Sequence, residues 1–347
     1  MIKSVRFVTA TALMFAMSTP AFATERVSVK EWAQKWADSL NTKKALAFST
    51  ADLEQKTLGF CSDCDNKTLM TKARKDFEAG KYDQAISSYN KIPRANTYWL
   101  DAVEEKGWAF FRKGEFEKTL AQTKTLLAPQ FAEITNTEAY LLQSLSQLKI
   151  CDYKGVFETH QAFKEKQKAR IMEVQALAKS GWNDSLTKFL KKADKFPLSM
   201  EDMGDSVTKL PLNIYKDIEF QKQVLRFKAS EKGIVFADSK NKSVVAKLEK
   251  INDAAFKALK NRVQELAQEE TNENFKIIQK LNLVEVEAIQ RVHTDQALTD
   301  EMYAKKTFNK VDSDKLVFMD DGRPWIDELD KFEVATKSCA QGLRRKM

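Results

Sequence analysis

The chain of 347 residues is 43% hydrophobic and 31% charged, a globular composition with material for one large or two modest cores. Because it contains only 10 Gly and 6 Pro, and Ala, Leu, Lys, Glu and Gln recur in long stretches, we expect an all-α fold and disfavour a sheet-rich one. The formal net charge of +8 comes from basic and acidic residues interspersed along the chain, a distribution that argues against nucleic-acid binding.

Residues 1–23 have the pattern of a secretory signal peptide. Lys3 and Arg6 form a basic start, residues 7–17 form a short apolar stretch, and the segment ends in Ala-Phe-Ala at Ala23. We expect cleavage after Ala23 and export to the periplasm, with secretion from the cell as the alternative. The mature chain would then have a net charge of about +6. No later stretch approaches the roughly 20 uninterrupted apolar residues that a spanning helix needs, so we expect no integral membrane segment.

A motif recurs at the spacing of a tetratricopeptide (TPR) repeat. The segment 79–86, Ala-Gly-Lys-Tyr-Asp-Gln-Ala-Ile, has equivalents at 113–120 and again at 150–157. A TPR repeat is about 34 residues long and forms a helix–turn–helix unit, which matches the first step of 34 residues and is close to the second step of 37. The sequence therefore predicts a TPR-type α-solenoid of about three repeats over residues 66–165, the fewest expected to be stable.

Three positions in each repeat carry the residue types that such a helical hairpin requires. They are a turn position (Gly80, Gly114, Cys151), an aromatic that opens the second helix (Tyr82, Phe116, Tyr153), and a small residue in the first helix (Ala73, Gly107, Ser144). Gly permits a left-handed turn, the aromatic ring fills the gap between the helices, and the small residue lets the paired helix approach. Flanking helices should cap the stack. Residues 29–40, with Trp32 and Trp36, are the N-terminal candidate, and the alternative is a free helix offered to a partner.

The chain beyond residue 165 is predicted to be helical without the repeat. Helices are expected at 166–179, 185–196 and 212–233 around a loop at 197–212. Residues 244–294 lack Pro and Gly and carry apolar residues at intervals of three and four, which predicts one long amphipathic helix or a coiled-coil hairpin. The pattern leaves open whether this segment packs on the repeats or self-associates with a second chain.

The predicted organisation is a short repeat block with a long helical C-terminal half. Its segments are a signal peptide (1–23), an N-terminal helix and cysteine loop (24–65), the repeats (66–165), a helical extension (166–240), a long amphipathic helix (241–296) and a tail with a final helix (297–347). The repeats therefore occupy fewer than half of the mature residues, so the binding function need not lie in the repeats alone.

The four cysteines predict disulfides in an oxidising compartment. Cys61 and Cys64 form a Cys-x-x-Cys pair, which we interpret as a structural disulfide in the loop that leads into the first repeat. A zinc site would need a second pair of ligands, and a thioredoxin-type site would need a preceding βα unit. Cys151 and Cys339 remain as a second bridge by elimination, although four cysteines allow three connectivities.

Catalytic motifs and cofactor sites are not evident in the sequence. The chain has two histidines and lacks a Gly-x-Ser-x-Gly motif, a phosphate-binding glycine loop and an HExxH motif. Carboxylate pairs such as Glu104-Glu105 and Glu269-Glu270 are interpreted as solvated faces. We therefore predict a protein that is not an enzyme and has no cofactor or metal. The alternative is a cell-wall or thiol-redox enzyme that uses the repeats as a carrier.

A partner-binding groove is predicted along the first helices of the repeats, which line the concave side of a TPR stack. Counting in the repeat register places seven side chains on or near that face: Met70, Arg74, Phe77, Glu104, Trp108, Phe111 and Leu141. The face becomes more apolar toward the third repeat, and the Lys and Asn pattern of carboxylate-clamp repeats is missing. A peptide or helix with apolar anchors is the expected ligand. The alternative for each residue is packing against flanking helices.

Several segments resemble one family of TPR proteins. They are residues 108–111 (Trp-Ala-Phe-Phe), 126–131, 138–142, 148–153, 210–227, Trp-Ile-Asp-Glu-Leu at 325–329, and Ser338-Cys339. Together they are similar to TPR proteins of deltaproteobacterial and Bdellovibrio-type envelopes, the group that includes adventurous gliding-motility TPR proteins. The resemblance implies a periplasmic scaffold for an envelope protein partner, in a motility or surface-transport complex.

Overall fold

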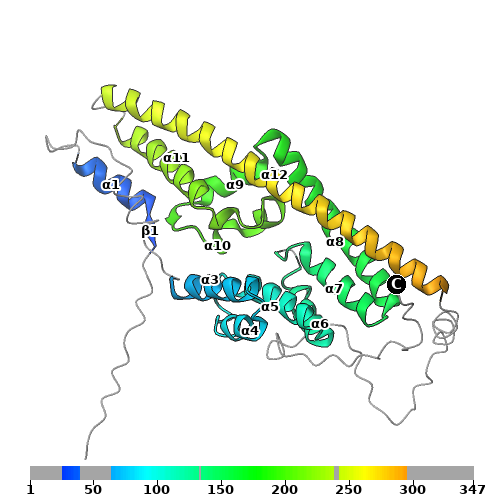
Figure 1. Cartoon of the computed structure of the whole chain (residues 1–347). Helices are drawn as coiled ribbons and strands as arrows, with labels where there is room; N and C mark the ends of the chain where they lie inside the picture. Colours follow the sequence, from blue (N-terminus) through cyan, green and yellow to red (C-terminus); the bar gives the residue numbers. More distant parts are fainter. Residues whose placement is uncertain (1–25, 40–63, 133, 238–241, 295–347) are drawn as a thin grey trace, which may run out of the picture.

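The computed structural model describes residues 26–39, 64–132, 134–237 and 242–294, and these are almost wholly helical (Figure 1). The α-helices are α1 (Val29–Ser39), α3 (Cys64–Glu78), α4 (Tyr82–Tyr89), α5 (Trp99–Lys113), α6 (Phe116–Leu126), α7 (Glu138–Lys149), α8 (Tyr153–Ser180), α9 (Asp184–Lys192), α10 (Met200–Met203), α11 (Ile218–Ala237) and α12 (Lys242–Thr294). Two short 3-10 helices, η1 (Gly204–Lys209) and η2 (Ile214–Lys216), and an antiparallel pair of two-residue strands, β1 (Val27–Ser28) and β2 (Lys195–Phe196), complete the described elements. The all-α prediction is confirmed.

Three helical hairpins follow one another through the region of the sequence repeat: α3 with α4, α5 with α6, and α7 with α8. Each first helix ends at a residue with positive φ, which is 73° at Gly80, 79° at Gly114 and 62° at Cys151. The turn therefore has the same left-handed conformation in all three hairpins, even where cysteine replaces glycine. The assignment of these hairpins to the TPR class stays a prediction.

Aromatic rings and small side chains hold each hairpin closed. The ring of Phe77 lies edge-on to Tyr82 at 5.4 Å, and Phe111 lies edge-on to Phe116 at 5.5 Å, at equivalent positions of the first two hairpins. A Cβ added at Gly107 would approach Leu142 Cδ2 to 2.9 Å, so this helix position admits no side chain without a shift of its neighbours. The sequence pattern of the repeats thus reflects packing inside and between hairpins.

Helix α12 is the longest element, with 53 residues, and it joins the hairpins to the rest of the molecule. It packs along α11, α8 and α7, and in Figure 1 it runs diagonally along one side of the molecule. The predicted segment 244–294 is thus a single helix that packs back on the third hairpin. The helix predicted at 166–179 is the continuation of α8, which runs unbroken for 28 residues.

The N-terminal helix α1 does not cap the first hairpin as predicted. It packs against α11, while Val29 is fully buried and Trp32 partly buried in a core cluster formed mainly by α8, α9, α11 and α12. Backbone pairing of β1 with β2 and a hydrogen bond from Val29 N to Asp194 O (2.8 Å) fix this position. The apolar stripe of α1 is a packing surface, but the helix that it packs on is distant in sequence. The Trp36 side chain lies outside the described part.

Alanine substitution is expected to affect stability differently at two glycines, Gly181 after α8 and Gly114 after α5. Gly181 (φ 66°) ends α8, and a Cβ placed there would lie 3.0 Å from the carbonyl oxygen of Lys260 on α12, whereas a Cβ at Gly114 (φ 79°) would meet nothing within 4 Å. Both alanine variants incur the left-handed backbone cost of about 1 kcal/mol, and Gly181→Ala also pushes α8 away from α12. We expect Gly181→Ala to lower the free energy of unfolding by about 2–3 kcal/mol and Gly114→Ala by about 1 kcal/mol in urea titrations. Equal losses would contradict this view of the contact.

Candidate functional site

The seven predicted groove residues do not share one exposed face. Met70 is 2% exposed in the core formed by the first two hairpins, and Leu141 is 1% exposed in the core that α7 and α8 form with α12. Neither side chain can touch a partner without repacking its core, so both assignments are corrected to structural roles. Apolar residues at helical spacing occur both in the core of a hairpin and on a ligand-binding surface. The sequence pattern therefore does not distinguish a core position from a binding position.

Phe77 and Phe111 also have a structural role. Each is partly buried and packs on the aromatic residue that opens its hairpin's second helix, Tyr82 and Phe116 respectively. Trp108 lies edge-on to Phe111 at 5.7 Å and remains partly exposed. Of the predicted set, Arg74, Glu104 and Trp108 are therefore the side chains left to form a surface site.

Arg74 connects the first two hairpins through a carboxylate on α5. Its guanidinium donates to Glu105 through Nε (2.9 Å) and Nη2 (2.6 Å), and the Tyr89 hydroxyl donates to the other oxygen of Glu105 at 2.8 Å. Burial and the neighbouring Glu105 charge raise the pKa of Tyr89, so its phenol remains a donor. The Arg74 side chain is 54% exposed, so its outer face remains accessible.

Glu104 and Glu138 form a hydrogen-bonded carboxyl pair between α5 and α7. Burial raises the pKa of Glu104 well above its usual value, and the charges of Glu138, Asp101 and Glu105 raise it further. Burial also raises the pKa of Glu138, although Lys280 on α12 counteracts this. The raised pKa of Glu104 therefore favours a proton on this carboxyl group, in a hydrogen bond to Glu138.

We call these four acids, Asp101, Glu104 and Glu105 on α5 and Glu138 on α7, the carboxylate row. Three of the four have a basic neighbour. Asp101 pairs with Lys216 Nζ on η2 at 2.8 Å, Glu105 with Arg74, and Glu138 with Lys280. The main charges acting on Glu104 come from the other three carboxylates, which disfavour its ionised form and would attract a cation brought close to it.

Trp108 lies beside the carboxyl pair of Glu104 and Glu138. It lies one helical turn after Glu104, and its indole N–H is near enough to Glu138 to lower the pKa of that carboxyl. The Nε1 atom itself is buried and makes no hydrogen bond of normal geometry. The site thus combines a hydrogen-bonded carboxyl pair among other carboxylates with a partly exposed aromatic ring, a combination suited to a cationic group.

Helix α12 covers the apolar end of the predicted groove. Thr137, at the start of α7, donates to the buried Asn274 of α12 at 2.7 Å, and Leu141 belongs to the same cluster as Ile277 and Leu281. The increasingly apolar face of the third repeat is therefore occupied by the chain's own helix. What remains on the first-helix side is the carboxylate row with Arg74 and Trp108.

Most of the carboxylate row is not predicted from the sequence. The sequence does not single out Asp101 or Glu138, or the partner Lys216, and it assigns the pair Glu104-Glu105 to a solvated face. One signal is present, because Glu138 occupies the position of Asp101 in the repeat register: each lies six residues before the small residue of its first helix, Ser144 and Gly107 respectively. The solvated reading of Glu269-Glu270 is also wrong in part, since Glu270 makes an ion pair with the buried Arg170. In a charge-rich chain, the sequence alone does not show which adjacent acidic residues are buried.

Cys151 is disulfide-bonded. Cys61 and Cys339 lie outside the described residues, as does the side chain of Cys64, so no pairing is described for them. Cys64 begins α3 and Cys151 follows the end of α7, with α5 packed between these helices, whereas a disulfide needs Cα atoms within about 7 Å. This arrangement argues against a bridge from Cys151 to Cys64, and the bridge from Cys151 to Cys339 stays a prediction.

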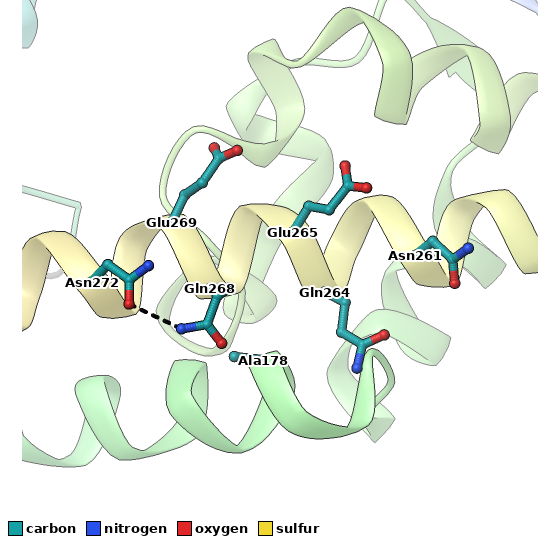
Figure 2. A pocket seen from close by; sticks show the side chains of 7 residues that line it. All are labelled: Ala178, Asn261, Gln264, Glu265, Gln268, Glu269 and Asn272. Carbon is teal, nitrogen blue, oxygen red and sulfur yellow. Dashed lines mark hydrogen bonds between the residues drawn. The ribbon is translucent and has the colours of Figure 1, made fainter.

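Two hollows occur elsewhere on the described surface. One, of about 530 Å³, lies between α8 and α12, and Figure 2 shows its lining of amides and carboxylates, among them Gln264, Gln268 and Asn272. The other, of about 500 Å³, lies between α8 and η1 and includes Arg170 and Lys209. Neither is lined by the predicted groove residues.

Comparison with models of protein families, with curated proteins and with solved structures finds no match for this chain. Among the described residues, no group of three or more His, Cys, Asp or Glu side chains is arranged to hold a metal ion. None of the helices in the described ranges is both long and apolar enough to cross a bilayer.

Proposed function

We propose that this chain is an exported, non-enzymatic TPR-type scaffold that binds a basic segment of another cell-envelope protein along the carboxylate row. The hydrogen-bonded carboxyl pair of Glu104 and Glu138 beside Trp108 carries this proposal. A lysine or arginine of a partner would take the place of the proton shared by the two carboxyl groups and would contact an aromatic ring at the same time. The ligand class expected from the sequence, a segment with apolar anchors, is thereby narrowed to one that presents a cation.

Three features of the sequence support the remaining parts of the proposal. The signal-peptide pattern of residues 1–23 supports export, and the repeat-length spacing of equivalent motifs supports the TPR class. The resemblance to envelope TPR proteins supports a periplasmic scaffold in a motility or surface-transport complex. The repeated left-handed turns at Gly80, Gly114 and Cys151 add weight to the TPR assignment.

The test is affinity capture of envelope proteins by the purified protein and by the double variant Glu104→Gln/Trp108→Ala. We expect the variant to lose at least one partner that the wild type retains, and the affinity for that partner to fall by about tenfold or more, since the variant removes both a carboxyl group that would bind the cation and the aromatic ring that would contact it. A matched control, Glu158→Gln/Phe256→Ala, changes an exposed acid of α8 and an exposed aromatic residue of α12, both outside the carboxylate row.

Two further measurements make this test decisive. Melting curves must show that each variant remains folded, and cross-linking must place a lysine or arginine of the partner at Glu104. Identical partner profiles for the wild type and the double variant, or a partner segment that contains no basic residue, would refute the assignment of the site.

A further inference from the structure

The exposed side of α12 divides into two strips with different chemistry. One strip is charged and consists of Glu265, Glu269, Glu273, Lys276 and Lys280. The other contains only amides and apolar residues: Gln268, Asn272, Phe275, Gln279, Asn282, Leu283, Val286 and Ile289. A helix face that meets only water in a chain with 31% charge is expected to carry Lys and Glu, so the uncharged strip needs an explanation.

Large apolar side chains are concentrated on the uncharged strip. Phe275 is 60% exposed, Leu283 70%, Val286 51% and Ile289 41%. These are four of the eight exposed large hydrophobic residues in the described part of the chain, and they all lie in the C-terminal half of one helix. Contiguous apolar exposure of this kind marks an interaction surface.

The spacing of the strip is that of a coiled coil. From Gln268 the uncharged residues follow at alternating intervals of four and three, through Asn272, Phe275, Gln279, Asn282 and Val286 to Ile289. This is a seam of three heptads, on the side of α12 opposite the buried Ile277, Leu281, Val284 and Ala288. The next seam position toward the N-terminus is Glu265, whose charge is paired with Arg262 at 2.8 Å.

We propose that this seam, residues 268–289 of α12, binds the same seam of a second copy of this chain in a parallel, in-register coiled coil. In such a pair each residue faces its own counterpart, so a charged strip would repel itself and an uncharged strip does not. Amides both donate and accept hydrogen bonds, so Gln268, Asn272 and Gln279 can pair with themselves, and the apolar positions can do likewise. The seam is therefore complementary to itself.

The residues that flank the seam favour the parallel arrangement. In a parallel coiled coil, the residue that precedes every second seam position (here Glu265, Asn272 and Gln279) contacts the residue five places later in the other helix. The resulting contacts join Gln264 to Glu269, Thr271 to Lys276, and Ile278 to Leu283 of the second copy, and no like charges meet. An antiparallel pair would instead place the amide end of the seam, shown in Figure 2 at Gln268 and Asn272, against the apolar end at Val286 and Ile289.

Sedimentation velocity of the purified protein tests the proposal. The wild type is expected to dimerise reversibly, and Val286→Lys/Ile289→Lys should raise the dimer dissociation constant by about 100-fold or more, because like charges then face each other. The matched control, Ile218→Lys/Val235→Lys, changes two apolar residues of similar exposure on α11 (53% and 71%) and should leave the dimer intact. Since all four side chains are exposed, the monomer should remain folded.

Variants with one added cysteine test the register of the two helices in the dimer. Gln268→Cys and Asn282→Cys should each form an intermolecular disulfide under mild oxidation, because both positions face themselves in a parallel pair. A monomeric wild type at all concentrations, a dimer that survives Val286→Lys/Ile289→Lys, or cross-linking of only one of the two cysteine variants would overturn the proposal.

Discussion

Replacing Glu270 with Leu should lower the free energy of unfolding by about 3–5 kcal/mol, because the buried Arg170 would then lack its counter-charge. The side chains of Arg170 and Glu270 are only 6% and 14% exposed, and they form an ion pair between α8 and α12. Arg170 also donates to Leu210 O at 3.3 Å, and Glu270 accepts from Leu212 N at 2.9 Å. The pair thus joins two long helices to the loop between η1 and η2.

Urea titrations monitored by circular dichroism measure this loss, and two variants serve as controls. Arg170→Met/Glu270→Leu removes both charges and should cost clearly less than Glu270→Leu alone, since no unpaired charge remains. Glu287→Gln breaks an exposed ion pair with Arg291 (2.7 Å), where the expected change is about 0.5 kcal/mol or less. A double variant as unstable as the single one would show that packing, and not charge, holds this junction.

Local structure is more predictable from this sequence than the packing of the helices on one another. The turn conformation at Gly80, Gly114 and Cys151 and the extent of α12 depend on nearby residues, so residue types and their spacing specify them. The packing of α1 on α11 depends on a contact between distant segments. An apolar stripe predicts that a helix face is buried, but it does not predict which element packs on that face.

The candidate site is only partly predictable for a related reason. The repeat register identifies Arg74, Glu104 and Trp108, because it places them on the first helices. It misplaces Met70, since inward and outward positions of a first helix both accept apolar residues, and the burial of Met70 follows from the packing of α3 on α4 and α5. The acids that give the site its charge resemble a solvated face in the sequence, because burial and proton sharing arise only when α5 and α7 are brought together.

Glu104→Gln should stabilise the protein at neutral pH by about 0.5–2 kcal/mol, the range typical of changes that relieve a local conflict. Burial raises the pKa of Glu104, so the folded state holds a proton that the unfolded state releases near the usual value of 4.5. The favourable contribution of Glu104 is therefore complete below pH 4.5 and is lost as the pH rises through the raised pKa. A glutamine retains the neutral form at every pH, so its advantage should appear only as the solution becomes less acidic.

Thermal melts of the wild type and Glu104→Gln from pH 4 to pH 8 measure this difference, which should be near zero at the acidic end. Glu105→Gln is the matched control, because the neighbouring Glu105 has partners in Arg74 and Tyr89, so its loss should destabilise the fold by about 1 kcal/mol. A gain for Glu104→Gln that does not vary with pH would contradict the shared-proton interpretation. If Glu104→Gln is both more stable and weaker in binding a basic partner, the unfavourable burial of this carboxyl is best explained by binding, since folding alone would favour the amide.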